Sequence, residues 1–580
     1  MGERFAVGID LGTSTSEICV FRHGRPEPVP VASSKSVVLP SLVALNSRDE
    51  LLVGEEARGA VDVPGRGVRE SKRLMGRDVE IPLGSRRHRP PEIAAIILRA
   101  LKESAEVYLN QPVREAVVSV PANFDDVAKR ATFDAARIAG LEVQLLVAEP
   151  TAAALAYGLT RLDADEQLLV FDFGGGTLDI SILEMMSGVI EVRSSHGDVA
   201  LGGKDFDDVM ISLLKQRVIQ SVPQVRLSAN LDRDLKDRAE RAKVDLSSRT
   251  TTEVQLRNVG ATATQQIDLD VVVSRDDYDR HCSELLSRTR ACLRTALGAK
   301  GVRPSSVQKI LLVGGTSYIP AVRNIIEETF GKQGSADVPA DLAVAMGASI
   351  RAAQVSGLLD GATGPVITDV APKGVGIAVV EVVGDRRMLV YEPLIRPNTT
   401  IPFRTRKTYR LMSSEQDAVN VCVYQDSTGR ARYPEDAVLM KEAVITDVPC
   451  ASDGTPHAIE VLFQYDLNGL IRVEGTIPAT GQTVVIEEKA NAAVLSPEGR
   501  AEAEKRVSEL WQSRPEAREF RAVIEKAERM LGELSGTSRE AIRQAVGELK
   551  AAIESGDAGA TRRLGNRLVD LLYDCEREEE

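Results

Sequence analysis

The sequence predicts a multidomain protein with an α/β region, then an all-β region, then an α-helical region. Three observations predict this order. Strand-like and helix-like segments alternate over about the first 355 residues, short strands and turns run from about residue 370 to 488, and apolar residues recur at helical spacing after residue 490. The length of 580 residues agrees, because a single domain usually spans about 100–200 residues.

Composition and charge exclude several classes of protein. With 27% charged and 43% hydrophobic residues the chain is globular, and no apolar run approaches the roughly 18 residues of a membrane span. The start, Met1–Ala6, lacks the apolar region of a signal peptide. The net charge, 72 − 85 = −13, disfavours nucleic acid and anionic membranes as partners. Six scattered cysteines without a C-x-x-C pattern predict reduced thiols in a cytoplasmic protein.

The first region reads as α/β because strands and helices take turns along it. Strand-like runs lie at Phe5–Ile9, Ala116–Val120, Leu168–Asp172 and Ile310–Val313. Helix-like runs lie at Glu92–Leu109, Asp126–Ala139 and Ala321–Phe330.

An internal repeat lies within this region. Val7-Gly8-Ile9-Asp10-Leu11-Gly12-Thr13 matches Val170-Phe171-Asp172-Phe173-Gly174-Gly175-Gly176-Thr177 in pattern: a strand ends in Asp, and a glycine-containing turn with Thr leads into a second strand. The second strands are Glu17–Phe21 and Asp179–Leu183. Two such hairpins predict a duplicated domain whose halves face one cleft.

The two turns carry the residue types of a metal–triphosphate clamp. Glycines let backbone N–H groups approach phosphate oxygens, and an Asp at a strand end can hold Mg²⁺, mostly through water. Asp10 and Asp172 stand at these places, and a third turn, Val313-Gly314-Gly315, also follows a strand. Neither turn has the P-loop or the dinucleotide-binding pattern. One such turn alone would indicate an ordinary hairpin, whereas the repetition favours a phosphate site.

The pattern of predicted secondary structure changes after the linker-like stretch Gly361–Pro365. The all-β pattern follows in short strands at Val375–Val383, Lys407–Leu411, Val419–Tyr424, Ile459–Tyr465, Leu470–Gly475 and Thr483–Ile486. A helix start at Ser496-Pro497-Glu498 opens the helical region. Three apolar stripes follow there, one within Phe520–Leu534, one within Ala541–Ile553 and one within Leu564–Leu572. They predict either a partner-binding surface or, as we favour, a bundle that buries its own stripes.

Four motifs carry a resemblance to a known family: Gly8–Thr13, Glu149-Pro150-Thr151-Ala152-Ala153-Ala154, Asp172–Thr177 and Leu312-Val313-Gly314-Gly315. In this order they resemble the heat shock protein 70 kDa (DnaK-type) chaperones, as does the order of the regions. The resemblance implies an actin-like ATPase domain at 1–359, a linker at 360–371, a β-sandwich substrate-binding domain at 372–488 and a helical lid at 489–580. The tail Glu576–Glu580 differs from the eukaryotic cytosolic one, which indicates a bacterial-type member.

The resemblance also implies roles for single residues around ATP or ADP. Gly12, Thr13, Ser14 and Thr15 would contact the phosphates from one lobe, and Gly174, Gly175, Gly176 and Thr177 from the other. Asp10 and Asp172 would place Mg²⁺, and Asp179 a monovalent cation such as K⁺. Lys72 would reach the γ-phosphate and the attacking water, with Glu149 in the same catalytic centre. Without the resemblance, Lys72 would read as a surface lysine. Positive charge and an oriented nucleophile are what phosphoryl transfer needs.

The adenosine side matches the family less closely. Glu240, Lys243 and Ser247 match its nucleoside-binding helix, Gly314, Gly315 and Thr316 its third glycine turn, and Asp341 an acidic position. Tyr318 stands in place of an Arg that stacks on adenine, and an aromatic ring also stacks on a base. A short basic stretch, Arg86–Arg89, replaces a family insertion and reads as a solvated loop.

The β-region resembles the peptide-binding sandwich of the family. Val419 falls where the family lines its central pocket, Val421 is next on the same face, and Met388 lies in a strand beyond the first loop. Judged by pattern alone, both valines would be sandwich core. Such a groove binds extended peptide through backbone hydrogen bonds and an apolar pocket.

The function implied is that of an ATP-dependent molecular chaperone of the stress response, which binds and releases unfolded polypeptide as ATP is hydrolysed. A J-domain co-chaperone and a nucleotide-exchange factor would be its partners. A specialised or regulatory family member is the nearest alternative. A small-molecule kinase or an actin-like filament protein would share only the ATPase core.

Two departures concern the coupling of the domains. The family's linker is a short leucine-rich run before an Asp, whereas here Thr368 precedes Asp369 in place of an apolar residue. Gln144 and Leu145 stand where the family has Lys and Arg, so Asp369 is predicted to lack its cation. We therefore expect a generic J-protein to stimulate this ATPase poorly, or a dedicated partner to supply the coupling.

Overall fold

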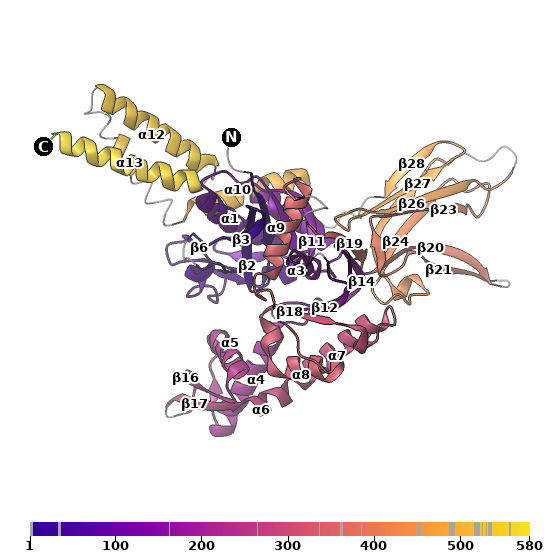
Figure 1. Cartoon of the computed structure of the whole chain (residues 1–580), viewed down its shortest axis with the longest axis horizontal. Coiled ribbons are helices and arrows are strands. Elements are labelled where there is room, and N and C mark those ends of the chain that lie inside the picture. The colour runs from indigo at the N-terminus through magenta and orange to yellow at the C-terminus, as the bar shows by residue number, and fades with distance from the viewer. Residues whose placement is uncertain are drawn as a thin grey trace.

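The computed structural model describes residues 4–32, 36–161, 163–263, 265–335, 337–359, 364–383, 386–448, 454–486, 494–514, 523–524, 526–528, 531, 536–555 and 558–579. Within them, no helix combines the length and apolarity needed to cross a bilayer. The order of regions is the predicted one: mixed α/β sheets first, a β-rich middle and a helical C-terminal segment (Figure 1).

The α/β region contains two sheets built on the same hairpin. In the first, of order β11-β10-β1-β2-β3, β1 (Ala6–Asp10) pairs antiparallel with β2 (Thr15–Arg22). In the second, of order β18-β12-β13-β14-β19-β22, β12 (Glu166–Phe173) pairs antiparallel with β13 (Leu178–Met186). A parallel strand follows on the other side of each, β10 (Glu115–Val120) beside β1 and β18 (Lys309–Val313) beside β12. The predicted repeat is thus present in the backbone.

Helices cover these sheets with their apolar faces. In α1 (Pro90–Leu109) the proline at the start pre-sets the helical backbone, and Ile93, Ile96, Ile97 and Leu101 recur at helical spacing and are buried. The other helices of the region are α2 (Asp126–Ile138), α3 (Glu149–Gly158), α4 (Gly203–Ser221), α5 (Leu231–Ser248), α6 (Arg275–His281), α7 (Ser283–Gly298), α8 (Pro320–Phe330) and α9 (Ala343–Val355). The α3 and α9 helices share one apolar core with both sheets and so join the lobes.

Shorter strands complete the region. They are β3 (Arg25–Pro28), β4 (Leu39–Pro40), β5 (Leu42–Leu45), β6 (Leu51–Val53), β7 (Gly67–Arg69), β8 (Ile81–Leu83), β9 (Arg86–His88), β11 (Glu142–Ala148), β14 (Val189–Asp198), β15 (Arg226–Leu227), β16 (Thr251–Ala261) and β17 (Gln266–Ser274). The interpretation of Arg86–Arg89 as a loop is wrong, because β9 pairs with β8. The two arginines are exposed, whereas His88 is buried opposite Ile81 and anchors the strand.

The predicted linker is in part a strand. β19 (Val366–Ala371) pairs parallel to β14 at Val366–Thr368 and antiparallel to β22 (Thr399–Ile401) at Asp369–Ala371. One sheet therefore runs from the α/β region into the β-domain, with the linker strand as the joint between them.

The β-domain is a sandwich of two four-stranded sheets. One has the order β21-β20-β24-β25 and the other β23-β26-β27-β28. The strands are β20 (Gly374–Val383), β21 (Arg386–Ile395), β23 (Phe403–Arg410), β24 (Val419–Asp426), β25 (Val438–Ile445), β26 (Ala458–Tyr465), β27 (Ile471–Ile477) and β28 (Gln482–Ile486). Their inward residues form one apolar core, as period-two alternation requires.

The helical segment divides into two parts. α12 (Gly536–Ser555) and α13 (Ala558–Glu579) pack on each other through Ile542, Leu549, Leu568 and neighbours, as predicted for a bundle that buries its own stripes. Phe520 and Leu534 of the first stripe lie outside the described residues.

The first helix of the segment, α10 (Pro497–Gln512), packs instead on the first lobe. Figure 1 shows α10 beside α1. Ala503, Val507 and Trp511 of α10 join that lobe's core, and ion pairs with α1 and α2 flank this contact. The pairs are Arg500–Asp134, Arg506–Glu92 and Arg514–Glu103, at 2.8–2.9 Å.

Candidate active site

A small cavity of about 250 Å³ lies where the two repeated turns face each other. Most residues predicted for nucleotide, metal and catalysis line it: Asp10, Gly12, Thr13, Ser14, Thr15, Lys72, Glu149, Asp172, Gly174, Gly175, Gly176, Thr177, Glu240, Lys243, Gly314, Gly315, Thr316 and Asp341. The fold thus brings together residues more than 300 positions apart in the sequence.

The glycine turns approach each other too closely for side chains. A Cβ added to Gly175 would lie 1.9 Å from the Ser14 Oγ, and one added to Gly176 would lie 2.4 Å from the Thr13 Oγ1. Backbone N–H groups and hydroxyls therefore share this wall of the cavity without a Cβ between them. Phosphate oxygens are the groups that such a cradle suits.

Lys72 and Glu149 form a buried ion pair inside the cavity. Lys72 lies on a short 3₁₀ helix, Ser71–Leu74, and its Nζ donates to the Glu149 Oε1, which α3 presents at its first residue. Burial lowers the pKa of Lys72, but the carboxylates of Glu149 and Asp10 outweigh it and leave this pKa above its ordinary value. Burial raises the pKa of Glu149 to about 7, with Lys72 opposing. A charged lysine beside a carboxyl that titrates near neutrality suits phosphoryl transfer and proton handling.

Carboxyl groups outnumber cations in the cavity. Burial raises the pKa of Asp10 and Asp172, and for Asp172 the neighbouring carboxylates add to the rise. Asp179 is not among the lining residues; it is buried opposite Asp172 in the hairpin, and burial raises its pKa as well. The Ser119 Oγ donates to Asp10 at 2.6 Å, and the Asn123 Nδ2 donates to Asp179 at 2.7 Å. Oxygen ligands with surplus negative charge are what Mg²⁺ requires, so these residues fit the metal that the motifs imply.

Glu17 is a residue of this cavity that the motifs did not reveal. It lines the cavity at 2% exposure, and its Oε1 has no hydrogen-bond partner among the described residues. The internal repeat could have identified it. Glu17 pairs with Asp10 across the first hairpin, as Asp179 pairs with Asp172 across the second. Glu17 is therefore the counterpart of Asp179 in the other lobe.

Arg73 was missed as well. Its guanidinium donates to the Gly176 carbonyl at 2.7–3.0 Å and to Asp205 at 2.5 Å, which ties the first lobe to the phosphate turn of the second. It follows Lys72 in the sequence, and no motif singled it out.

Glu17→Gln is expected to stabilise the protein against unfolding at alkaline pH. Burial, and then Asp10, raise the pKa of Glu17 well above 4.5, so the ionised side chain costs stability once the pH exceeds the unfolded-state pKa. We expect a gain of about 1 kcal/mol or more near pH 8, shrinking as the pH falls towards 5. Thermal melts at both pH values measure it, with exposed Glu253→Gln as control. An equal gain at both would contradict the titration argument.

Only some of the residues predicted to bind the nucleoside line the cavity. Glu240 and Lys243 of α5 line the cavity, and the Lys243 Nζ lies 2.8 Å from the Asp207 Oδ1. Ser247 and Tyr318 are not among the lining residues. The Ser247 hydroxyl donates to the Lys243 carbonyl within the helix, and Tyr318 is 41% exposed with the Arg323 guanidinium 5.1 Å from its ring centre. Contact of either residue with the nucleoside stays a prediction.

The three residues predicted for peptide binding differ in accessibility. Val421 is buried in the sandwich core, Val419 is half-buried at the edge of that core, and Met388 is exposed on β21. Pairing of β20 with β24 stops at Ile377 and Val423, although both strands continue. Figure 1 shows the β20–β21 hairpin diverging from the β23–β28 sheet beyond this point.

The expectation that Asp369 lacks its usual cation concerns positions 144 and 145 only, and two cations on other elements act on Asp369 instead. Asp369 is half-buried, and desolvation raises its pKa, while Lys129 and Arg351 act in the opposite direction. The Thr151 Oγ1 donates to it at 3.1 Å. Leu145, where a cation was sought, is buried in the core shared by the lobes, and Gln144 donates to Glu115. The cations near Asp369 come from α2 and α9, which a local motif cannot reveal.

Two lobes around a phosphate-type cavity, joined through a strand to a β-sandwich and followed by helices, define a chaperone-type ATPase. The model of a protein family described as "Hsp70 protein" matches residues 6–87 and 78–567. The chain therefore belongs to the heat shock protein 70 kDa family, which uses ATP and ADP with Mg²⁺. This membership disfavours the kinase and filament alternatives.

Proposed function

We propose that this protein binds and releases extended segments of unfolded polypeptide in the β-domain, under control of ATP hydrolysis in the cavity between the lobes. The observation that carries the proposal is the continuous sheet. β12 and β13 flank the phosphate turn at Gly174–Thr177, β14 follows β13, and β19 pairs with both β14 and β22. A movement of the phosphate turn thus has a backbone path to the sandwich.

Side-chain contacts between the domains support the same coupling. The Asp126 Oδ1 of α2 accepts the Ile471 N–H at 2.9 Å, and the Lys129 Nζ donates to the Gly469 carbonyl at 3.2 Å. The Leu146 N–H donates to the Asn468 Oδ1 at 2.9 Å. The turn between β26 and β27 is therefore held by the first lobe, and a two-state arrangement of the lobes would reach this turn.

The diverging hairpin supports a peptide groove. Beyond Ile377 and Val423 the facing edges of β20 and β24 do not pair with each other, and an extended chain can bond to such edges. The hairpin also exposes apolar side chains, among them Val380, Val382, Met388 and Leu389. Exposed apolar surface on a strand ribbon is typical of an interaction site.

In the ATPase step, Thr13, Ser14, Thr15 and the Gly174–Thr177 turn would hold phosphate oxygens. Lys72 would stabilise charge that develops on the transferring phosphoryl group, and Glu149 would accept or return the proton of the attacking water. Asp10 and Asp172 would hold Mg²⁺, which neutralises phosphate charge when bound. Asp179 would hold a monovalent cation such as K⁺.

The test is whether ATP lowers the affinity for an extended peptide. Fluorescence anisotropy of a labelled leucine-rich peptide, with ATP and with ADP, measures it. We expect weaker binding with ATP, and by linkage the peptide should then weaken ATP binding in turn. Equal peptide affinity in both states would overturn the proposal. No peptide binding in either state would favour a regulatory member of the family.

Val419→Phe is expected to weaken peptide binding without changing basal ATPase. The larger ring would fill the groove edge where Val419 is half-buried, and overpacking would cost the sandwich about 1–3 kcal/mol. Val444→Phe is the matched control, since Val444 is exposed on β25, beside Asn420 on the other face. Unchanged affinity in a stably folded Val419→Phe protein would make Val419 a core residue only.

The finer assignments belong to the same proposal. A J-domain co-chaperone and a nucleotide-exchange factor would regulate the cycle in the cytoplasm, under stress.

Since Leu145 is a core residue, Leu145→Arg would bury a cation and report on folding rather than on coupling between the domains. Wild-type ATPase with and without a generic J-protein is the informative measurement.

A further inference from the structure

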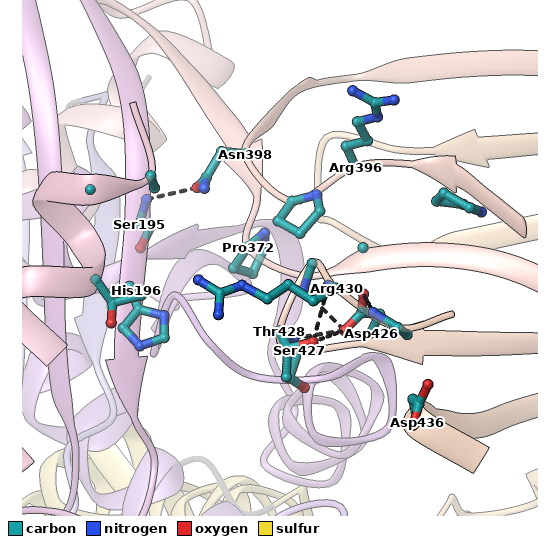
Figure 2. Close-up of a pocket in the computed structure, with 18 of the residues that line it drawn as sticks. Ser195, His196, Pro372, Arg396, Asn398, Asp426, Ser427, Thr428, Arg430 and Asp436 are labelled. Atoms are coloured by element: carbon teal, nitrogen blue, oxygen red, sulfur yellow. Dashed lines mark hydrogen bonds between the residues drawn. The ribbon is translucent and has the colours of Figure 1, made fainter. Parts of the chain in front are cut away.

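A second, larger cavity of about 1320 Å³ lies between the second lobe and the β-domain. Arg294 of α7 and His196 of β14 line it from the lobe, and Arg396, Arg430 and Tyr391 line it from the β-domain. Figure 2 shows the Arg430 side chain reaching across towards His196. None of these residues belongs to the ATPase cavity.

The arginines that line this cleft outnumber its acids by three to two. No ion pair is present for Arg294, Arg396 or Arg430 in the described part of the chain, and each is exposed. The two acids of the lining are already engaged. Asp426 accepts four hydrogen bonds from its own loop at 2.7–3.0 Å, and Asp436 accepts two backbone N–H groups at 3.0–3.2 Å. In a chain of net charge −13, this cleft is a local concentration of cations.

Tyr391 adds an observation of a different kind. The residue lines the cleft and is only 5% exposed, and its hydroxyl is shielded from solvent and has no hydrogen-bond partner among the described residues. A buried hydroxyl without a partner costs free energy, so a ligand that reaches it from the cleft with an acceptor would relieve that cost.

The layout of the charges indicates the class of ligand. In Figure 2 the guanidinium groups of Arg396 and Arg430 point in different directions, so these two charges are not focused on one point. A chain of anionic groups matches this better than a single ion. An acidic peptide adding to the edge of β21 is disfavoured here, because Pro393 has no N–H and the Tyr391 N–H already donates to the Arg432 carbonyl at 2.9 Å.

We propose that this cleft binds a linear phosphate-chain anion, of the tripolyphosphate class, and that the bound anion holds the β-domain against the second lobe. Guanidinium groups pair well with phosphate oxygens, and the Tyr391 hydroxyl would donate to one of them. Both domains supply ligands, and the Asn398 Oδ1 already accepts the Ser195 N–H at 2.9 Å beside the cleft. Anion binding would therefore favour the docked arrangement by its affinity difference between docked and undocked protein. This inference does not rest on peptide binding.

The test uses the full chain saturated with ADP, so that the ATPase cavity is filled. Calorimetric titration with inorganic tripolyphosphate should show saturable binding. Arg294→Glu and Arg430→Glu should each weaken it about tenfold or more, and Tyr391→Phe by about threefold to tenfold, since charge-assisted hydrogen bonds are lost. Arg404→Glu, an exposed arginine on β23 outside the cleft, is the matched control and should leave affinity unchanged. ADP affinity should not change in any variant.

Titrations with GTP and with hexaglutamate decide whether the ligand is a free phosphate chain, a nucleotide or an acidic peptide. GTP binding more tightly than tripolyphosphate, with the same dependence on Arg294 and Arg430, would support the site and identify a nucleotide as its ligand. Hexaglutamate binding more tightly than either would overturn the phosphate assignment in favour of an acidic protein segment. Absence of saturable binding, or binding that survives both arginine reversals, would show that the cleft is only a gap between domains.

Discussion

We expect Lys72→Ala to slow ATP hydrolysis by about 10²–10³-fold, the effect of removing one electrostatic stabiliser of a transition state. The Lys72 ammonium group is buried beside Glu149 and Asp10 in the cavity that the phosphate turns line. The fold should survive, because Glu149, with a pKa raised to about 7, can take up a proton instead of remaining as a buried unpaired charge.

Single-turnover hydrolysis with purified protein measures the effect, and a thermal melt checks the fold. Lys215→Ala is the matched control, since Lys215 lies on α4 and pairs on the surface with Asp232 at 2.7 Å. It should turn over like the wild type. Near-wild-type turnover of a folded Lys72→Ala protein would remove Lys72 from the catalytic centre.

Asp126→Ala should release the β-domain from the first lobe. Asp126 is buried, accepts the Ile471 N–H at 2.9 Å, and lies 3.6 Å from the buried Lys441 Nζ. Removing the acid leaves that lysine without its carboxylate, and breaking a buried pair costs about 3–5 kcal/mol. The loss of the hydrogen bond and the loss of the carboxylate both destabilise the arrangement in which the β-domain is docked on the first lobe.

Hydrogen exchange of the amides of β19 reports docking, because this strand pairs with both domains. We expect exchange there to rise by about 10²-fold in Asp126→Ala, in line with the lower end of that cost. Glu460→Gln in the exposed pair Arg406–Glu460 is the control within the β-domain and should leave exchange unchanged. Unchanged exchange in Asp126→Ala would show that the strand pairing alone holds the domains together.

The sequence predicts the elements of this fold better than it predicts their assembly. The expected helix Asp126–Ala139 is found as Asp126–Ile138, and the expected strand Ile310–Val313 lies within Lys309–Val313. Such elements follow from periodicity, which is local. The docking of α10 does not, because Arg500 and Arg506 meet acids more than 360 positions earlier in the chain.

The candidate site shows the same division. Residues in strong local motifs, such as Asp10 and Gly175, can be placed without a structure. Glu17 needed the register of the hairpin, and Lys129 needed the contact of α2 with the β-domain. Tyr391 is beyond any motif, because its importance lies in a hydroxyl left without a partner by the surrounding fold.

The way in which β19 is held has an evolutionary consequence. Val366, Ile367 and Thr368 join β14 through main-chain hydrogen bonds in parallel register, so the ladder itself does not depend on which side chains are present. Substitutions at these three positions can therefore preserve the pairing of β19 with β14 while the family's linker motif disappears from the sequence. Thr368 is an example, since this polar residue pairs with Glu191 of β14 and does not interrupt the pairing of the two strands. Relatives ranked by linker sequence alone would be judged more distant in mechanism than their backbones are.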